Sequence, residues 1–215
     1  MRKKLFLVRH GQTLFNQKHK IQGWCDSPLT PKGVAESKAV GQYFRNRQIT
    51  FDKACCSTLL RTEETLKHII DLPYTRYEGL KEFGFGRLEG ASTDLILSFG
   101  HDLLNTSYTQ FGGEDPQEVQ DRMEKTLNDI VHEDVAKTIL IVAHGANLMN
   151  LLERIDPDHA KDAIRFINCV IYEVDYDGKN FTIVDSISLK LKNKIFLYLL
   201  FPLNEEVIKD GNGRF

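Results

Sequence analysis

The chain contains two short apolar runs that each end in a histidine–glycine pair. The run LFLV at residues 5–8 leads to RHG, which contains His10, and the run ILIV at residues 139–142 leads to AHG, which contains His144. A continuous apolar run of this length is typical of a strand that is buried on both faces of a parallel sheet. Residues just beyond the carboxyl ends of such strands lie where open α/β sheets bind ligands. The two runs therefore predict that both histidines reach one crevice.

Strand-like and helix-like segments alternate along the rest of the chain. Such alternation implies right-handed crossovers and a mainly parallel sheet. The predicted fold class is α/β: a three-layer α/β/α sandwich with a mainly parallel central sheet and an active site at the carboxyl ends of the strands. Further strands are predicted at residues 53–56 and 74–77, and a closing hairpin is predicted from residues 169–174 and 181–184, with its turn at residues 177–178.

Helix starts are marked by capping residues. Thr30 is followed by a proline, and Asp115 is followed by a proline and then by a glutamate that can return to the cap. Ser57 or Thr58 is expected to cap another helix, which would run through residue 70. The glycine-rich stretch at residues 83–90 does not fit a regular element and is predicted to be a loop near a site.

Composition excludes several classes of protein. The formal net charge of −2 gives no reason to expect binding to nucleic acid or to an anionic membrane surface. The apolar runs at residues 5–8 and 195–201 are too short for a signal-peptide core and a membrane span, respectively. The four cysteines show no CxxC pairing, so reduced thiols in a cytoplasmic protein are expected. They are Cys25, Cys55, Cys56 and Cys169.

The triplet around His10 is the densest chemical signal. A histidine at a strand end can attack through one nitrogen if a backbone carbonyl holds the other as N–H. Phosphorus is a plausible target, because phosphohistidine is a workable covalent intermediate. Arg9 offers a planar fork of donors for phosphoryl oxygens, Gly11 allows close backbone approach, and Asn16 can add an amide donor. The alternative is a hydrogen-bonded structural histidine.

Three further residues favour the chemical interpretation. Arg61 is expected in the first turn of a helix, near the end that attracts anions. His144, as an imidazolium, can stabilise the oxygens of a transferring phosphoryl group, and Glu82 can protonate a leaving alkoxide and later deprotonate water. Two of them have a plainer alternative: Arg61 as a surface residue paired with Glu64, and Glu82 as a solvated loop residue.

Taken in order along the chain, these segments resemble the histidine phosphatase superfamily, the phosphoglycerate-mutase-like proteins. A single RHG triplet would be weak evidence, whereas the ordered set is specific and extends from the first strand to about residue 186. Asp115 and Leu88 depart from the residues that are common at their positions in the family, Ser and Trp, respectively. The matching segments are LVRHGQT (7–13) with Asn16, IQGW (21–24), DSPLT (26–30), Ser57 with LRT (60–62) and Thr65, LKEF (80–83) with Gly86 and EG (89–90), GGE (112–114) and VAHG (142–145).

The resemblance implies a role for each of these residues. His10 would be the phosphorylated nucleophile, Glu82 rather than Glu89 the proton donor and acceptor, and Arg9, Arg61 and His144 the phosphate pocket. No metal and no cofactor are expected, and the sequence has neither a GxxxxGK[ST] phosphate loop nor a dinucleotide fingerprint. The remaining residues expected to bind the phosphate or the substrate are Gly11, Asn16, Gln22, Gly23 and Gly145.

The same resemblance divides the chain. Residues 1–186 are expected to form the histidine phosphatase domain, with a small substrate-side insertion at about residues 83–115, and residues 187–215 a C-terminal extension of unknown role. Alternating apolar and polar residues at 187–192 predict an edge strand. The apolar run at 195–201 fits core packing, a homodimer contact or a swapped element, and core packing is favoured.

The predicted function is a phosphomonoesterase that hydrolyses small-molecule phosphate esters through a phosphohistidine intermediate. A phosphoglycerate mutase is the alternative enzyme, but it needs extra cations for the substrate carboxylate, and residues 88–121 contain no lysine or arginine. A non-catalytic phosphate-binding regulatory module is the alternative of another class. A protein that had lost its activity should have lost at least one of the residues expected to carry the chemistry. All five are present, which argues against this alternative: Arg9, His10, Arg61, Glu82 and His144.

Overall fold

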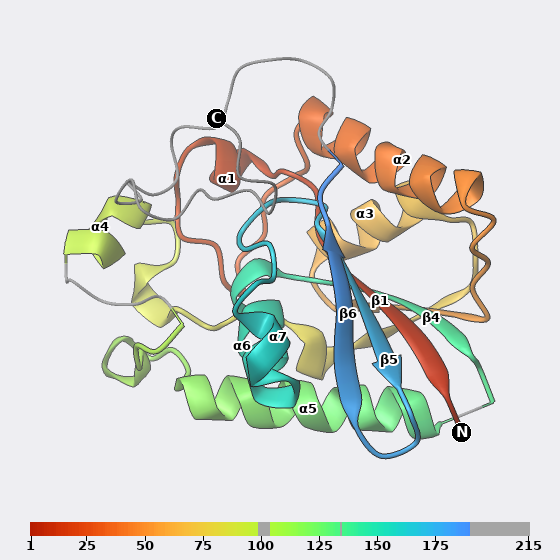
Figure 1. Cartoon of the computed structure of the whole chain (residues 1–215). Helices are drawn as coiled ribbons and strands as arrows, with labels where there is room; N and C mark the ends of the chain where they lie inside the picture. Colours follow the sequence, from red (N-terminus) through yellow and green to blue (C-terminus); the bar gives the residue numbers. More distant parts are fainter. Residues whose placement is uncertain (99–103, 134, 190–215) are drawn as a thin grey trace, which may run out of the picture.

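The computed structural model describes residues 1–98, 104–133 and 135–189. Its centre is a six-stranded sheet with the strand order β3-β2-β4-β1-β5-β6, flanked by helices on both faces (Figure 1). The strands β1 to β4 pair in parallel, whereas β5 and β6 pair antiparallel at one side. The predicted α/β fold with a mainly parallel sheet is therefore confirmed. The strands are β1 (Lys3–Arg9), β2 (Lys53–Ser57), β3 (Tyr74–Tyr77), β4 (Thr138–Ala143), β5 (Ile171–Tyr176) and β6 (Phe181–Ile187).

The two apolar runs are central strands that are buried on both faces. Leu5 and Leu7 of β1 belong to the core beneath α5 (Pro116–His132) and α6 (Gly145–Ile155). Their neighbours Phe6 and Val8 belong to the core beneath α2 (Pro31–Asn46) and α3 (Leu60–Ile69). Successive side chains of a strand point to opposite faces, so a strand between two helical layers must be apolar at every position.

Two of the predicted helix starts are confirmed. Thr30 accepts a hydrogen bond from the Gly33 amide at the start of α2. Asp115 accepts from the Gln117 amide at the start of α5, where a glutamate side chain returns to the cap. The third prediction is wrong: α3 begins at Leu60 after the N-cap residue Leu59, which makes no side-chain capping bond.

The correction at α3 has a physical reason. Strand β2 continues through Ser57, and the Ser57 hydroxyl is in contact with Thr62 and His144 as well as with the Leu59 amide. The hydroxyl is thus part of a buried polar network and is not a simple helix cap.

Short elements fill the connections around the sheet. The glycine-rich segment contains one turn of 3₁₀-helix, in which Gly86 has a φ of +56° and packs so closely on Phe111 that a side chain would clash. The hairpin turn at Asp177 and Gly178 is confirmed. The other short elements are α1 (Leu14–Gln17), α4 (Thr93–Ser98), α7 (Pro157–Ala160) and 3₁₀ turns at Glu78–Leu80, Gly86–Leu88 and Thr109–Phe111.

The predicted edge strand at 187–192 is only partly within the described residues. Strand β6 ends at Ile187, and Leu189 packs, partly buried, against the core on the α2 and α3 side. The rest of the predicted strand and the apolar run at 195–201 lie outside the described residues. No helix in the described part of the chain is both long and apolar enough to cross a lipid bilayer.

Candidate active site

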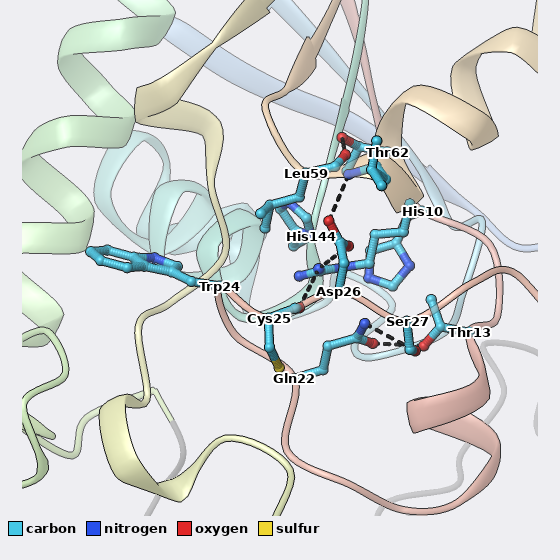
Figure 2. A network of polar contacts seen from close by, with 12 residues as sticks. His10, Thr13, Gln22, Trp24, Cys25, Asp26, Ser27, Leu59, Thr62 and His144 are labelled. Atoms are coloured by element: carbon cyan, nitrogen blue, oxygen red, sulfur yellow. Dashed lines mark hydrogen bonds and ion pairs between the residues drawn. The ribbon is translucent and has the colours of Figure 1, made fainter.

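The two strand-end histidines meet at the carboxyl ends of β1 and β4. The parallel register of these adjacent strands pairs Arg9 with Ala143, so the next residue along each strand is a histidine. The ring centroids of His10 and His144 are 5.2 Å apart, with an angle of 64° between the ring planes, and Figure 2 shows the two rings close to each other. Both side chains are buried. The expectation that the two histidines come together is confirmed.

His10 has the orientation that a nucleophile requires. Its Nδ1 lies 2.8 Å from the Gly11 carbonyl oxygen. Because a carbonyl only accepts, Nδ1 carries the proton and Nε2 has the lone pair. Burial, followed by the positive charges of Arg61 and Arg9, lowers the pKa of His10 well below its usual 6.5. The ring is therefore neutral, with an available lone pair, at physiological pH.

Arg61 holds the loop that passes beneath the histidines. Its Nη1 donates to the Cys25 carbonyl at 3.0 Å and to Asp26 Oδ1 at 2.8 Å, and its Nη2 donates to the Gly23 carbonyl at 2.7 Å. The side chain is buried, so the alternative of a surface arginine paired with Glu64 does not hold. Figure 2 shows Cys25 and Asp26 of this loop, with dashed lines that mark their contacts.

Arg9 is held from the opposite side. Its Nη1 donates to the Phe166 carbonyl, on the segment that precedes β5. The guanidinium lies against the start of α6, where a Cβ on Gly145 would approach Arg9 Nε to 3.0 Å and Cζ to 3.1 Å. Glycine at position 145 therefore allows the guanidinium to lie close to the helix start.

Three buried nitrogens of this site have no protein partner. In the described part of the chain, four buried side-chain nitrogens lack a hydrogen bond: Arg9 Nε, Arg61 Nε, His144 Nδ1 and Asn150 Nδ2. The first three belong to side chains that act electrostatically on His10 or on one another. Buried polar atoms are normally satisfied, so the two arginine Nε–H groups are donors that a bound anion can accept from, and His144 Nδ1 is a third nitrogen left for a ligand.

His144 is anchored through its other nitrogen. Its Nε2 lies 2.7 Å from the Ser57 hydroxyl oxygen at the end of β2. Burial, followed by Arg61 and His10, lowers the pKa of His144 well below 6.5. The imidazolium expected from the sequence is therefore not the resting form of this side chain, which is neutral at physiological pH.

Glu82 lies at the start of α6, beside His144. Its Oε1 accepts from the Phe83 amide at 2.9 Å and from the Asn147 amide at 2.8 Å, and its Oε2 accepts from the Ala146 amide at 3.1 Å. The carboxylate is 6% exposed, so it is not a solvated loop residue. An oxygen with two lone pairs and one amide contact, as at Oε2, retains one side for a transferable proton.

Glu89 accepts hydrogen bonds from the backbone of a loop. Its two oxygens accept from the Trp24 amide at 2.9 Å and from the Cys25 amide at 2.6 Å. These contacts fix the loop whose carbonyls hold Arg61. The geometry therefore supports the choice of Glu82 over Glu89 as the proton-transfer group.

The smaller predicted residues surround this centre. Gly11 donates its amide to Thr65 Oγ1 at 3.0 Å, and a Cβ at this position would clash with the Gly33 carbonyl. In the structure, Gly11 thus allows β1 to approach α2 closely. The Gly23 carbonyl accepts a hydrogen bond from Arg61 Nη2.

Asn16 and Gln22 both have partners within the protein. Asn16 Oδ1 accepts from the Thr13 amide and from Asn168 Nδ2, each at 3.1 Å. Gln22 accepts from the Thr13 hydroxyl at 2.6 Å and donates to Ser27 at 3.2 Å, contacts that are drawn in Figure 2. Because these two contacts use the Asn16 side-chain oxygen, the side-chain NH₂ group remains available to donate to other partners.

Asn168 was missed by the sequence analysis. Its Nδ2 donates to the His10 carbonyl and to Asn16 Oδ1, each at 3.1 Å. Asn168 lies between Phe166 and Cys169, two non-glycine residues with positive φ values of 57° and 56°. Such conformations are costly and tend to occur at functional sites. No sequence signal marked this asparagine.

Arg122 was also missed. It forms a two-pronged ion pair with Glu114 at 2.7 and 2.8 Å and donates to the carbonyls of Gly79, Lys81 and Glu82. Arg122 therefore fixes the backbone that carries Glu82. The signal was the GGE segment, which the resemblance included without a role.

Within residues 1–98, 104–133 and 135–189, no group of three or more His, Cys, Asp or Glu side chains is placed to hold a metal ion. The four cysteines are free thiols.

Two histidines and two arginines thus lie at the carboxyl edge of an α/β sheet, and comparison with known proteins identifies the family. The chain belongs to the histidine phosphatase superfamily (branch 1), which it matches over residues 5–187. A 2,3-bisphosphoglycerate-dependent phosphoglycerate mutase of Mesorhizobium japonicum is 32% identical over 179 residues, covering 77% of this chain and 87% of that protein. A probable phosphoglycerate mutase GpmB of Yersinia pestis is 34% identical over 183 residues, covering 80% and 84%. The crystal structure of a phosphoglycerate mutase from Bacillus anthracis superposes with a TM-score of 0.74 at 25% identity, covering 86% of this chain and 92% of that one.

Proposed function

We propose that this protein is a metal-independent phosphomonoesterase that hydrolyses small-molecule phosphate esters through a phosphohistidine at His10. One observation carries the proposal: Arg9 Nε, Arg61 Nε and His144 Nδ1 are buried without partners around a histidine that retains its Nε2 lone pair. The oxygens of a phosphoryl group can pair with all three of these nitrogens, and its electrophilic phosphorus can react with the fourth nitrogen, His10 Nε2.

The proposed reaction has two balanced steps. In the first, His10 Nε2 forms a bond to phosphorus, the bond from phosphorus to the ester oxygen breaks, and Glu82 donates its proton to the leaving alkoxide. In the second, Glu82 takes a proton from water as the water oxygen attacks phosphorus, and the bond to His10 breaks to release phosphate. Arg9 and Arg61 stabilise the charge on the transferring group in both steps.

The choice of hydrolysis over mutase activity rests on charge. A mutase substrate carries a carboxylate besides its phosphate, whereas residues 88–121, which run from the glycine-rich segment into the first turns of α5, contain no lysine or arginine. The names of the curated relatives favour the other candidate, a phosphoglycerate mutase dependent on 2,3-bisphosphoglycerate. Both functions use the same phosphohistidine, and they differ in whether water or a second phosphoglycerate accepts the phosphoryl group.

Three assays distinguish the functions. Phosphate release from p-nitrophenyl phosphate and from 3-phosphoglycerate should be detectable in the wild type and absent in His10→Ala. Conversion of 3- to 2-phosphoglycerate with a bisphosphoglycerate primer should be slower than hydrolysis, and the reverse order would establish the mutase. Labelling with a radioactive phosphoester should give an acid-labile phosphoprotein, whereas tight phosphate binding without labelling would indicate a non-catalytic module.

A further inference from the structure

The hydroxyls of Ser57 and Thr62 form a chain of hydrogen bonds that ends on His144. Thr62 Oγ1 lies 2.8 Å from the Leu59 carbonyl oxygen and 2.9 Å from Ser57 Oγ. Ser57 Oγ in turn lies 3.2 Å from the Leu59 amide and 2.7 Å from His144 Nε2. Each of these four contacts requires one hydrogen, and all of them are buried. A longer contact, 3.3 Å from Thr62 Oγ1 to the Ser57 carbonyl oxygen, again offers the Thr62 hydroxyl only an acceptor.

Only one placement of the hydrogens satisfies all four contacts. A carbonyl oxygen only accepts, so the single Thr62 hydroxyl proton lies on the Leu59 contact. Thr62 Oγ1 must then accept from Ser57, which uses the single Ser57 proton. Ser57 Oγ therefore accepts both from the Leu59 amide and from His144 Nε2. If Ser57 instead donated to His144 Nε2, the single Thr62 proton could serve only one of two close oxygen contacts, that with the Leu59 carbonyl at 2.8 Å or that with Ser57 Oγ at 2.9 Å, and the other would have no proton.

This placement has a consequence for His144 Nδ1. A neutral imidazole has one proton, and Ser57 holds it at Nε2. Nδ1, which is buried and has no protein partner, then carries a lone pair. A lone pair cannot donate to a phosphoryl oxygen, so a proton must be added before His144 can assist the anion.

We propose that a phosphate group enters this site together with one proton, which lies between a phosphoryl oxygen and His144 Nδ1, and that Ser57 and Thr62 are the positioning residues that impose this requirement. The inference rests on the proposed function, because it assumes that the pocket receives a phosphoryl group. When an ester enters as its monoanion, it brings the proton itself. When the group enters as a dianion, the proton comes from solvent.

The charged groups around His144 are consistent with the joint binding of a phosphate group and a proton. Arg9 and His10 face it from the end of β1, Arg61 from α3, Arg122 from α5, and Glu82 from the loop that precedes the glycine-rich segment. Burial, followed by Arg61, lowers the pKa of His144 when the ring is surrounded by these groups alone. A phosphoryl dianion offsets the positive charges around Nδ1, which favours the second proton only while the anion is bound.

The tautomer can be measured directly on the ligand-free protein. With ¹⁵N-labelled histidine, the ring of His144 is identified among the seven histidines by its absence in His144→Gln. We expect Nε2 to show a protonated signal and Nδ1 a lone-pair signal. In Thr62→Val, the Ser57 proton is freed to point at His144 Nε2, so the two signals should exchange. Thr62→Ser keeps the hydroxyl and should match the wild type. A wild-type proton on Nδ1 would overturn the inference.

The proton count is measured by calorimetry with inorganic phosphate. At about pH 8, where phosphate is mostly the dianion, titrations in two buffers of different ionisation enthalpy should show an uptake of about one proton by the wild type and by Thr62→Ser. Thr62→Val should take up close to none. Ser57→Ala, which removes the anchor of Nε2, serves as a second variant with the same expectation. Phosphate binding without proton uptake in the wild type would overturn this inference alone, whereas absence of phosphate binding would overturn the proposed function as well.

Discussion

His10 and His144 lie side by side in one pocket but are anchored through opposite nitrogens. His10 is held through Nδ1 by the Gly11 carbonyl, and His144 is held through Nε2 by the Ser57 hydroxyl, with 5.2 Å between their ring centroids. The pocket therefore receives Nε2 from the first ring and Nδ1 from the second. Two sequence segments of the same construction thus present two different nitrogens, to which the proposed function assigns the roles of nucleophile and of contact to the phosphoryl oxygens.

The stability of the folded protein should fall on mild acidification. Burial, followed by the charge of Arg61, lowers the pKa of both His10 and His144 well below 6.5. In the unfolded chain each pKa returns to about 6.5, so below that pH the unfolded chain binds more protons than the folded one. The contribution of these two histidines to the free energy of unfolding should therefore be constant above this pH and fall below it by about 1.4 kcal/mol per pH unit for each histidine. Urea denaturation in phosphate-free buffers measures this slope.

A single substitution isolates the contribution of one ring. His144→Gln removes one of the two titrating rings that bind a proton in the unfolded chain only. The slope of its free energy of unfolding against pH, between about pH 6.5 and pH 5, should therefore be roughly half that of the wild type. His68→Gln, in α3, is the matched control and should keep the wild-type slope. Equal slopes in the wild type and in His144→Gln would show that His144 titrates alike in both states.

Arg61→Ala should damage both stability and activity. The substitution removes the donors to the Gly23 and Cys25 carbonyls and leaves Asp26 without its ion pair. Breaking a buried ion pair costs about 3–5 kcal/mol, and we expect a cost at the lower end because Asp26 is partly exposed. Loss of one donor to the transferring group should lower kcat/KM by about 100-fold. Urea denaturation and p-nitrophenyl phosphate kinetics measure the two effects.

Two variants separate these effects of Arg61. Asp26→Asn keeps the shape of the loop and an acceptor for Arg61, so it should cost less stability and retain most of the activity. Arg61→Lys keeps the charge but cannot reach three acceptors with one ammonium group. If Arg61→Lys retained full activity, the forked geometry would not be needed.

Asn168→Asp should reduce activity indirectly, by displacing His10. Asn168 Nδ2 donates to the His10 carbonyl and to Asn16 Oδ1, and an aspartate would set its oxygens against both acceptors. Leaving such groups unpaired costs about 1–3 kcal/mol, and we expect a fall in kcat/KM of about 10-fold from the displacement of His10. Asn46→Asp, at the exposed end of α2, is the control. Unchanged kinetics in Asn168→Asp would show that the backbone alone holds His10.

The sequence was sufficient to predict the central sheet and the pairing of the two histidines. The reason is that a strand between two helical layers must be apolar at every position, so residues 5–8 and 139–142 stand out. The parallel register then brings the residues after the strands together, and the pairing of Arg9 with Ala143 does so in the structure.

The supporting residues could not be predicted in the same way. Ser57 and His144 are 87 positions apart, and Asn168 and His10 are 158 apart. A polar side chain that holds another across such a distance leaves no periodic pattern in the sequence. Ser57 was assigned to a helix cap because serine before a helix has that role on average, whereas the strand end turns its hydroxyl toward His144.

Glu82→Gln should separate the formation of the phosphoenzyme from its hydrolysis. An alkyl phosphate needs a proton for its leaving group, whereas p-nitrophenolate leaves without one. With p-nitrophenyl phosphate, the variant should therefore still show a rapid burst of nitrophenol, followed by a steady rate that is lower by at least about 100-fold because water lacks its base. Phosphorylated His10 should accumulate during this phase, as acid-labile label on the protein. With an alkyl phosphate, no burst should be seen.

The matched control for Glu82 is Glu89→Gln, in the adjoining glycine-rich segment. Glu89 holds the amides of Trp24 and Cys25, so its loss should loosen the loop that anchors Arg61. This effect acts on the phosphate pocket and should slow both substrates by a similar factor, without accumulation of phosphoenzyme. If Glu82→Gln also slowed both substrates equally, proton transfer would have to be assigned to another group, and Glu82 would be left with the role of holding the start of α6 through the Ala146 and Asn147 amides.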